Sequence, residues 1–156
     1  MIVVKFGGHA MKDENGAFAK AIAVAQRDGV ELVIVHGGGP QIDAALKSAA
    51  ITSEFVGGFR VTTPEIFDVV ERVLAGEVGP AVAQSLEREG VNAIAISGRK
   101  SGTLFAKPLK ALVDGTPADL GLVGVVTSVN SSSIMNAVAS RQVPVVSPIA
   151  CEESTD

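Results

Sequence analysis

Residues 32–46 read LVIVHGGGPQIDAAL, and in this stretch an apolar run gives way to glycines just where a helix is expected to begin. The first part is short, continuously apolar and rich in Val and Ile, which is typical of a strand buried on both faces of a parallel sheet. The second part has Pro40 ahead of apolar residues at helical spacing, and proline is favoured in the first turn of a helix. The stretch therefore predicts a strand, a tight glycine turn and a helix.

Strand and helix patterns of the same kind alternate along the chain, and this alternation predicts the fold class. Three more apolar runs have the character of buried strands, and apolar residues at helical spacing lie between them. This alternation is typical of an open, mostly parallel α/β sheet with right-handed crossovers and helices on both faces. The other expected strands are Ile2 to Phe6, Ala93 to Ile96 and Val143 to Val146, and the expected helices lie around 18–25, 42–49, 64–76 and 131–138.

Two stretches interrupt the alternation and predict β-hairpins. In the first, Phe55 to Val61, short apolar pieces flank Gly57 and Gly58,. In the second, residues 104–110 and 120–127 are separated by a loop rich in turn residues. We expect both hairpins at the margin of the sheet, and we expect residues 151–156 to form a short polar tail.

The bulk composition indicates one soluble domain, residues 1–156. A chain of this length buries a substantial core. Hydrophobic residues make up 47%, charged residues make up 19%, and the formal net charge is -4, which argues against disorder and against a nucleic-acid-binding surface,. No apolar run approaches the roughly 20 residues that cross a bilayer, no signal peptide is recognised, and Cys151 has no partner for an internal disulfide. A cytoplasmic location with no membrane partner is expected.

Glycines follow the first two strands at the end where open α/β sheets bind ligands. Gly37, Gly38 and Gly39 precede a helix, whose free N–H groups and positive dipole end favour phosphate or carboxylate. Gly7 and Gly8 follow the first strand. The spacing matches neither the Walker loop nor the dinucleotide motif, and a simple tight turn is the alternative interpretation.

Two basic side chains are candidates for the same site. Lys5 lies in an apolar run, where its ammonium must reach solvent or an anion, and a positive charge beside N–H donors suits phosphoryl transfer. The alternative is an edge-strand lysine that extends into water. Arg60 could bind a carboxylate through two parallel hydrogen bonds, or it could be an ordinary surface residue. His9 and His36 have no clustered Cys or carboxylate nearby, so no metal site is predicted.

Taken in order, five motifs resemble the acetylglutamate kinases within the amino-acid kinase family. They are VVKFGGHAM (3–11), VIVHGGGPQI (33–42), GGFRVTTPE (57–65), GLVGVV (121–126) and VPVVSPI (143–149). The resemblance implies an enzyme of arginine biosynthesis that transfers the γ-phosphate of ATP to the side-chain carboxylate of N-acetyl-L-glutamate.

The resemblance also implies roles for individual residues. Lys5 would be catalytic, stabilising the transferring phosphoryl group, with Gly7 and Gly8 against the phosphates. Gly37, Gly38 and Gly39 would bind the reacting carboxylate, and Arg60 would bind the α-carboxylate. ATP with Mg²⁺ is implied for the full-length enzyme, and a homodimer is implied through the helix at 64–76.

The family pattern continues beyond the last motif with an N-x-N-A-D segment and an ATP-binding lobe that this sequence does not contain. We therefore expect a substrate-binding and dimerisation half that is inactive alone and binds no nucleotide tightly. Two alternatives stay open: a kinase for another acylated amino acid, such as carrier-linked aminoadipate, and a non-catalytic partner-binding module.

Overall fold

A four-stranded parallel sheet organises the chain, of which the computed structural model describes residues 1–13 and 15–153. The strand order is β1-β2-β8-β5, so both β8 and β2 have neighbours on each side. Each predicted strand is confirmed, and the open α/β fold is confirmed with them. The strands are β1 (Ile2–Phe6), β2 (Leu32–His36), β5 (Ala93–Ser97) and β8 (Val143–Ser147).

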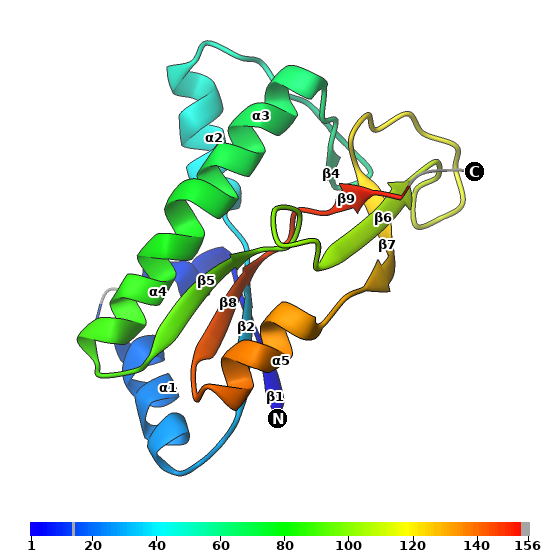
Figure 1. Cartoon of the computed structure of the whole chain (residues 1–156). Helices are drawn as coiled ribbons and strands as arrows, with labels where there is room; N and C mark the ends of the chain where they lie inside the picture. Colours follow the sequence, from blue (N-terminus) through cyan, green and yellow to red (C-terminus); the bar gives the residue numbers. More distant parts are fainter. Residues whose placement is uncertain (14, 154–156) are drawn as a thin grey trace.

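Helices form a layer on each face of this sheet (Figure 1). On one face, α1 (Ala17–Arg27) and α4 (Gly79–Arg88) pack together, and Ile22 and Leu86 join Ile34 and Val145 in the main core. On the other face, the short α5 (Ser132–Ala139) contacts β8, β2 and β5. None of the helices in the described ranges is both long enough and apolar enough to cross a membrane.

A single helical run joins α3 (Pro64–Val73) to α4 through the wider π-helical turn η2 (Leu74–Val78). Pro80 explains the wider turn, since proline has no N–H to donate and its ring clashes with the carbonyl four residues earlier. The Gly79 N–H bonds instead to Leu74 O, five residues back. The prediction that this helix ends near Gly76 is therefore wrong: the chain stays helical to Arg88.

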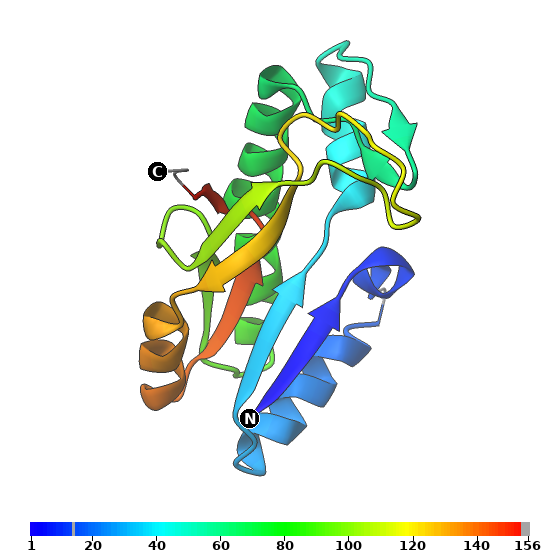
Figure 2. The same ribbon diagram turned by 90° about the vertical axis from the view of Figure 1, so that its right-hand side faces the viewer.

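The edge strand β1 departs from the prediction of burial on both faces. Val3 is 64% exposed and Lys5 is exposed, whereas Phe6 is buried in the main core and Val4 packs against it; Ile2, at the start of the strand, is 52% exposed. Figure 2 shows α5 beside β8 and away from β1, and the contacts of α5 are with β8, β2 and β5. Because side chains alternate along a strand, one face of β1 packs on α1 and the opposite face meets solvent.

Both hairpins form, but as separate sheets rather than as margins of the main sheet. β3 (Phe55–Val56) and β4 (Phe59–Arg60) are joined by Gly57 and Gly58, whose φ angles of 57° and 85° suit a type I′ turn,. β6 (Leu104–Pro108) pairs with β7 (Gly124–Val129).

The predicted polar tail is wrong in its first part. Cys151 and Glu152 form β9, which pairs in parallel with β6 at Phe105 and Ala106. The Cys151 thiol donates a hydrogen bond to Arg99 O at 3.3 Å. Residues 154–156 of that predicted tail lie outside the described residues.

The packing of α2 against α3 fixes the position of the glycine turn that follows β2. α2 (Gly39–Ser48) packs against α3, and its buried Ile42 and Leu46 belong to the main core. Thr63 begins α3, because its hydroxyl accepts a hydrogen bond from the Ile66 N–H at 3.3 Å,. Packing against α3 fixes the direction in which the N-terminus of α2 points.

Candidate functional site

The two glycine turns meet at the carboxyl ends of β1 and β2. The strands are paired in register with Phe6 opposite His36, so the turns begin side by side. The Gly37 N–H donates to Phe6 O at 2.8 Å, and a Cβ placed on Gly37 would lie 3.5 Å from the Cα of Gly7. The predicted phosphate-binding Gly7 and the predicted substrate-binding Gly37 are therefore backbone neighbours. Gly8 follows with a φ of 59° and begins the 3₁₀ turn η1 (Gly8–Lys12).

The N-terminus of α2 carries two glycines with unpaired backbone N–H groups among the described residues: Gly39, which is exposed, and Gly38, which is buried. Gly38 is the residue that caps α2, no side chain caps the helix, and its carbonyl accepts from the Ile42 N–H at 2.9 Å. Within residues 1–13 and 15–153, no acceptor contacts the N–H of Gly38 or of Gly39. Free N–H groups at the positive end of a helix dipole bind anions, so the turn can hold a carboxylate or a phosphate.

Lys5 lies two residues before Gly7. It is on the same face of the sheet as α5, but α5 does not extend over β1. It pairs with Val35 on the adjacent strand and its side chain is exposed. In the part of the chain that the structure describes, no carboxylate forms an ion pair with its ammonium group. Its positive charge is thus available at the sheet end where the glycine turns lie.

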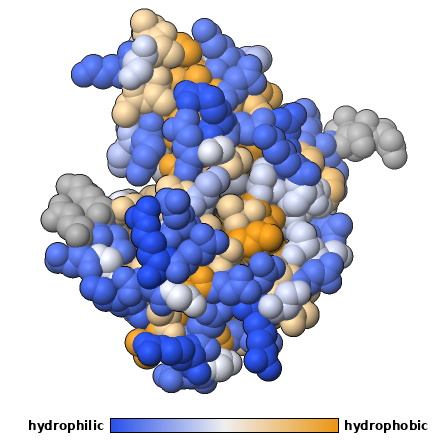
Figure 3. All heavy atoms as spheres, turned by 60° about the vertical axis from the view of Figure 1, so that its left-hand side comes forward, coloured by the Kyte–Doolittle hydropathy of each residue, from blue (hydrophilic) through white to orange (hydrophobic). Residues whose placement is uncertain are grey.

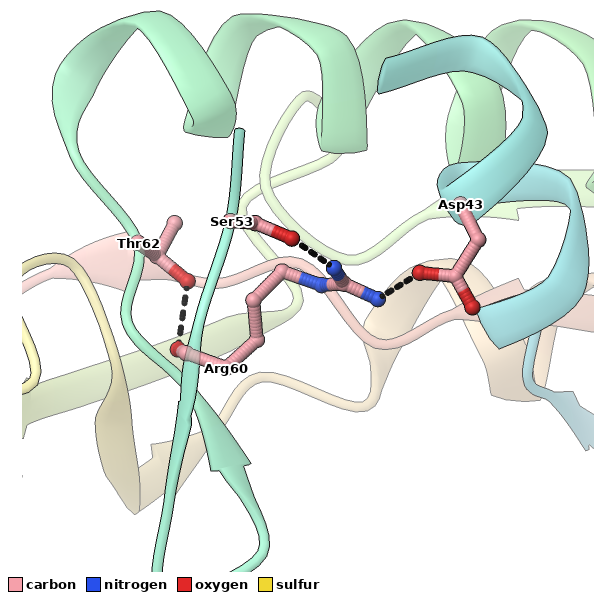
Figure 4. A network of polar contacts seen from close by, with 4 residues as sticks. All are labelled: Asp43, Ser53, Arg60 and Thr62. Atoms are coloured by element: carbon pink, nitrogen blue, oxygen red, sulfur yellow. Dashed lines mark hydrogen bonds and ion pairs between the residues drawn. The ribbon is translucent and has the colours of Figure 1, made fainter. Parts of the chain in front are cut away.

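Arg60 is held rigidly beside α2 and is not an ordinary surface arginine (Figure 4). Its Nη1 donates to Ser53 Oγ and its Nη2 to Asp43 Oδ1, each at 2.6 Å. The guanidinium also stacks 4.5 Å from the centre of the Phe55 ring. The Arg60 side chain is 11% exposed, whereas that of Asp43 is 60% exposed.

The position of Asp43 relates Arg60 to the glycine turn. Asp43 follows Gly39 by four residues on α2, so the two lie one above the other on the same helix face. A helical side chain also tilts toward the N-terminus of its helix, which brings the Asp43 carboxylate and the bound guanidinium toward Gly39. Arg60 is thus bound to α2 about one helical turn after Gly39,. The sequence reasoning missed Asp43 and Ser53, although the four-residue spacing from Gly39 was a usable signal for the first.

A cleft found elsewhere in the structure is unsuited to anions. It has a volume of about 560 Å³ and lies between η1, α1 and α4, on the side where Figure 3 shows hydrophobic atoms between hydrophilic rims. Its charged lining residues are Asp13, Glu77, Glu89 and Arg88, so carboxylates outnumber the single guanidinium. An anion there would meet net repulsion.

The described residues do not fit a resident metal ion. Among residues 1–13 and 15–153, no group of three His, Cys, Asp or Glu side chains is placed to hold one. His36 is buried and paired with backbone, and the side chain of His9 lies outside the part that the structure describes. Any Mg²⁺ that accompanies a nucleotide would need ligands from the nucleotide or from other residues.

Burial lowers the pKa of His36 below its ordinary value of 6.5, while its hydrogen bond to the Gly37 carbonyl opposes part of that shift. The neutral ring is therefore the folded form. At pH values between the lowered pKa and 6.5, His36 binds a proton in the unfolded chain but not in the folded chain,. The contribution of neutral His36 to the free energy of unfolding is therefore fully present above pH 6.5 and is lost as the pH falls,.

We predict that the free energy of unfolding decreases from pH 7 to about pH 5, and that His36→Asn shows a smaller decrease because Asn does not titrate. Urea unfolding at a series of pH values measures both slopes. Identical slopes for the two proteins would show that His36 is not the group responsible.

Comparison with known proteins agrees with the fold. The sequence profile described as the amino acid kinase family matches residues 1–156. An acetylglutamate kinase from Nocardia farcinica is 47% identical over 152 residues, which cover 96% of this chain and 50% of that protein. An acetylglutamate kinase from Rhodococcus jostii is 45% identical over 152 residues, covering 96% and 49%.

Among solved structures, that of smu.665 from Streptococcus mutans superimposes with a TM-score of 0.85 at 28% identity, covering 99% of this chain and 60% of that one. The chain spans about half the length of the curated relatives it matches. Because the family profile matches residues 1–156 of this chain, the chain belongs to the amino acid kinase family.

Proposed function

We propose that this chain is the substrate-binding half of an acetylglutamate kinase, which transfers the γ-phosphate of ATP to the side-chain carboxylate of N-acetyl-L-glutamate. The observation that carries the proposal is that the Gly38 and Gly39 N–H groups have no acceptor among the described residues, while the fixed Arg60 guanidinium is bound to the same helix at Asp43. Two separated anion-binding groups suit a ligand with two carboxylates. The names of the relatives, at 45–47% identity, favour N-acetylglutamate among such ligands.

In this proposal each site residue has a distinct electrostatic role. Arg60 binds the α-carboxylate, and the N–H groups of Gly37 to Gly39 orient the side-chain carboxylate. Lys5 meets the transferring phosphoryl group, whose equatorial oxygens carry the charge that a nearby cation stabilises. Gly7 and Gly8 let phosphate approach the backbone closely. Mg²⁺–ATP supplies the phosphoryl group, and no described residue is assigned to the metal.

The chain alone is expected to show no phosphoryl transfer, because the reaction requires ATP to be held in line with the acceptor. Joined to the second half of the Nocardia farcinica relative, it is expected to form acyl phosphate, which hydroxylamine traps as hydroxamate. The matched control is the same fusion carrying Lys5→Ala, which should bind acetylglutamate and form little product. A folded fusion that binds both substrates without making product would contradict the proposal, as would robust product from the 156-residue chain by itself.

We also propose a homodimer through the helix at 64–76. What supports it is that Phe67, Val69 and Val70 are only partly covered by their own core. Ile66 and Val73 of the same helix are buried within the chain, so they contribute to folding and not to assembly. Light scattering at high protein concentration is expected to give twice the chain mass, and Val69→Glu is expected to give a folded monomer. A folded wild-type monomer at that concentration would rule out the dimer.

A further inference from the structure

The imidazole of His36 lies directly under the glycine turn that begins α2. The side chain is 2% exposed, and its Nδ1 lies 2.8 Å from the carbonyl oxygen of Gly37. On its other side the ring packs against the π-helical run: a Cβ placed on Gly79 would lie 3.1 Å from Nε2. The ring is therefore fixed between the turn and the helix, and its contact with the turn is to a single peptide group.

The geometry shows which ring nitrogen carries the proton. At 2.8 Å, an unprotonated Nδ1 would place its lone pair against a lone pair of the Gly37 oxygen, so a proton must lie between them. Nε2 is then an acceptor, and it is buried without a partner among the described residues. A buried acceptor without a partner is tolerated better than a buried N–H without one, which favours the same tautomer.

This hydrogen bond fixes the peptide that joins Gly37 to Gly38. In a trans peptide the carbonyl of one residue and the N–H of the next point in opposite directions. With the Gly37 carbonyl held toward the imidazole, the Gly38 N–H must point away from it, and it meets no acceptor in the described residues. The Gly37 N–H is held separately by Phe6 O at 2.8 Å, so the turn is fixed at both ends of Gly37.

A turn made of glycines needs such a constraint. Glycine adopts both signs of φ at similar cost, so the peptide between two glycines can rotate to the reversed orientation with little strain. In that orientation a carbonyl oxygen replaces the N–H at the N-terminus of α2, and an approaching carboxylate or phosphate meets repulsion instead of a hydrogen bond.

We infer that His36 is a positioning residue, whose Nδ1–H holds the Gly37 carbonyl inward so that the Gly38 N–H is presented to the bound anion. The inference rests on the proposed function, because the anion it concerns is the side-chain carboxylate of N-acetylglutamate at that turn. His36 itself touches no substrate, and its ring donates only to the backbone.

Two variants separate this role from simple packing. In His36→Asn the side-chain amide can donate from about the place of Nδ1, whereas in His36→Gln it reaches about the place of Nε2. We expect His36→Asn to bind N-acetylglutamate within about threefold of wild type and His36→Gln to bind about tenfold more weakly, since one charge-assisted hydrogen bond is lost. Circular dichroism and thermal unfolding first establish that both variants are folded. Equal affinities for the two folded variants would overturn the inference.

A second readout needs no ligand and no variant. Long-range ¹H–¹⁵N spectra of the wild-type imidazole report which nitrogen is protonated, and we expect Nδ1. A proton on Nε2 would overturn the inference outright. If the folded wild type shows Nδ1–H but no saturable binding of N-acetylglutamate, the proposed function fails. The positioning role is then judged by the Gly38 amide resonance, which should be retained in His36→Asn and displaced in His36→Gln.

Discussion

Replacing Gly121 by alanine is expected to lower the free energy of unfolding by about 3–4 kcal/mol, the largest stability effect of a single methyl group that we predict for this chain. The new Cβ would lie 2.3 Å from Thr62 O, which is a backbone atom and cannot rotate away. Gly121 also has a φ of 64°, in the left-handed region that alanine disfavours,.

The surrounding hydrogen bonds prevent Thr62 from moving. The Thr62 N–H donates to Leu120 O at 3.0 Å, and the Leu122 N–H donates to Thr62 O at 2.7 Å. Leu120 is 1% exposed, so these bonds join the long loop after β6 to the segment that leads into α3. For a chain of this size the loss corresponds to a decrease of about 10 °C in Tm, which thermal unfolding measures.

Gly115→Ala is the matched control for this prediction. Gly115 has a φ of 85°, but no heavy atom lies within 4 Å of the place where its Cβ would be. It carries the backbone strain without the clash, so we expect a loss of about 1 kcal/mol. Similar losses for the two variants would show that φ strain alone, and not contact with Thr62, sets the cost.

Replacing Arg60 by alanine is expected to weaken the binding of N-acetylglutamate by roughly tenfold to a hundredfold. Under the proposed function the variant removes a charge-assisted hydrogen-bonded pair with the α-carboxylate, whose value is about 1.5–3 kcal/mol. The fold should survive, because the Asp43 carboxylate left behind is mostly exposed and can be solvated. Calorimetric titration measures the affinity, and circular dichroism checks the fold.

Two further variants test the direction of this effect. Asp43→Asn removes a carboxylate that competes for the same guanidinium, and we expect tighter binding by about threefold or more. Lys5→Ala should leave binding nearly unchanged, because the proposed partner of Lys5 is the phosphoryl group in transfer and not the resting substrate. Weaker binding by Asp43→Asn would mean that Asp43 holds Arg60 in place more than it neutralises it.

The parallel sheet could be predicted from sequence because its signal is local. Runs of Val and Ile such as Leu32 to His36 are typical of strands buried in the centre of a sheet. The glycines and Pro40 that follow are typical of a tight turn into a helix. Burial on both faces was wrongly extended to β1 because the composition of Ile2 to Phe6 is that of a central strand. Whether a strand lies at the edge depends on which strands pair with it, and that information is not local.

The polar contacts of the site were harder to predict. The spacing between Gly39 and Asp43 places both on one helix face, but it does not show that the β3–β4 hairpin folds back on to that face and brings Arg60 to Asp43. The π-helical turn was missed for a related reason: Pro80 signals a break, whereas the helical run continues past it while packed against β5 and β8,. His36 gave no periodic signal, because its contact is to the backbone of the next residue.

The most direct test of the central claim is a titration of the wild-type chain with N-acetyl-L-glutamate, followed by ¹H–¹⁵N spectra of the backbone amides and the Arg60 guanidinium. We predict saturable changes at Gly38, Gly39 and Arg60, and much weaker binding of N-acetyl-L-glutamine, which lacks the side-chain carboxylate. Saturable changes confined to the acidic cleft at Glu77 and Glu89, or no saturation by a well-folded chain, would contradict the account.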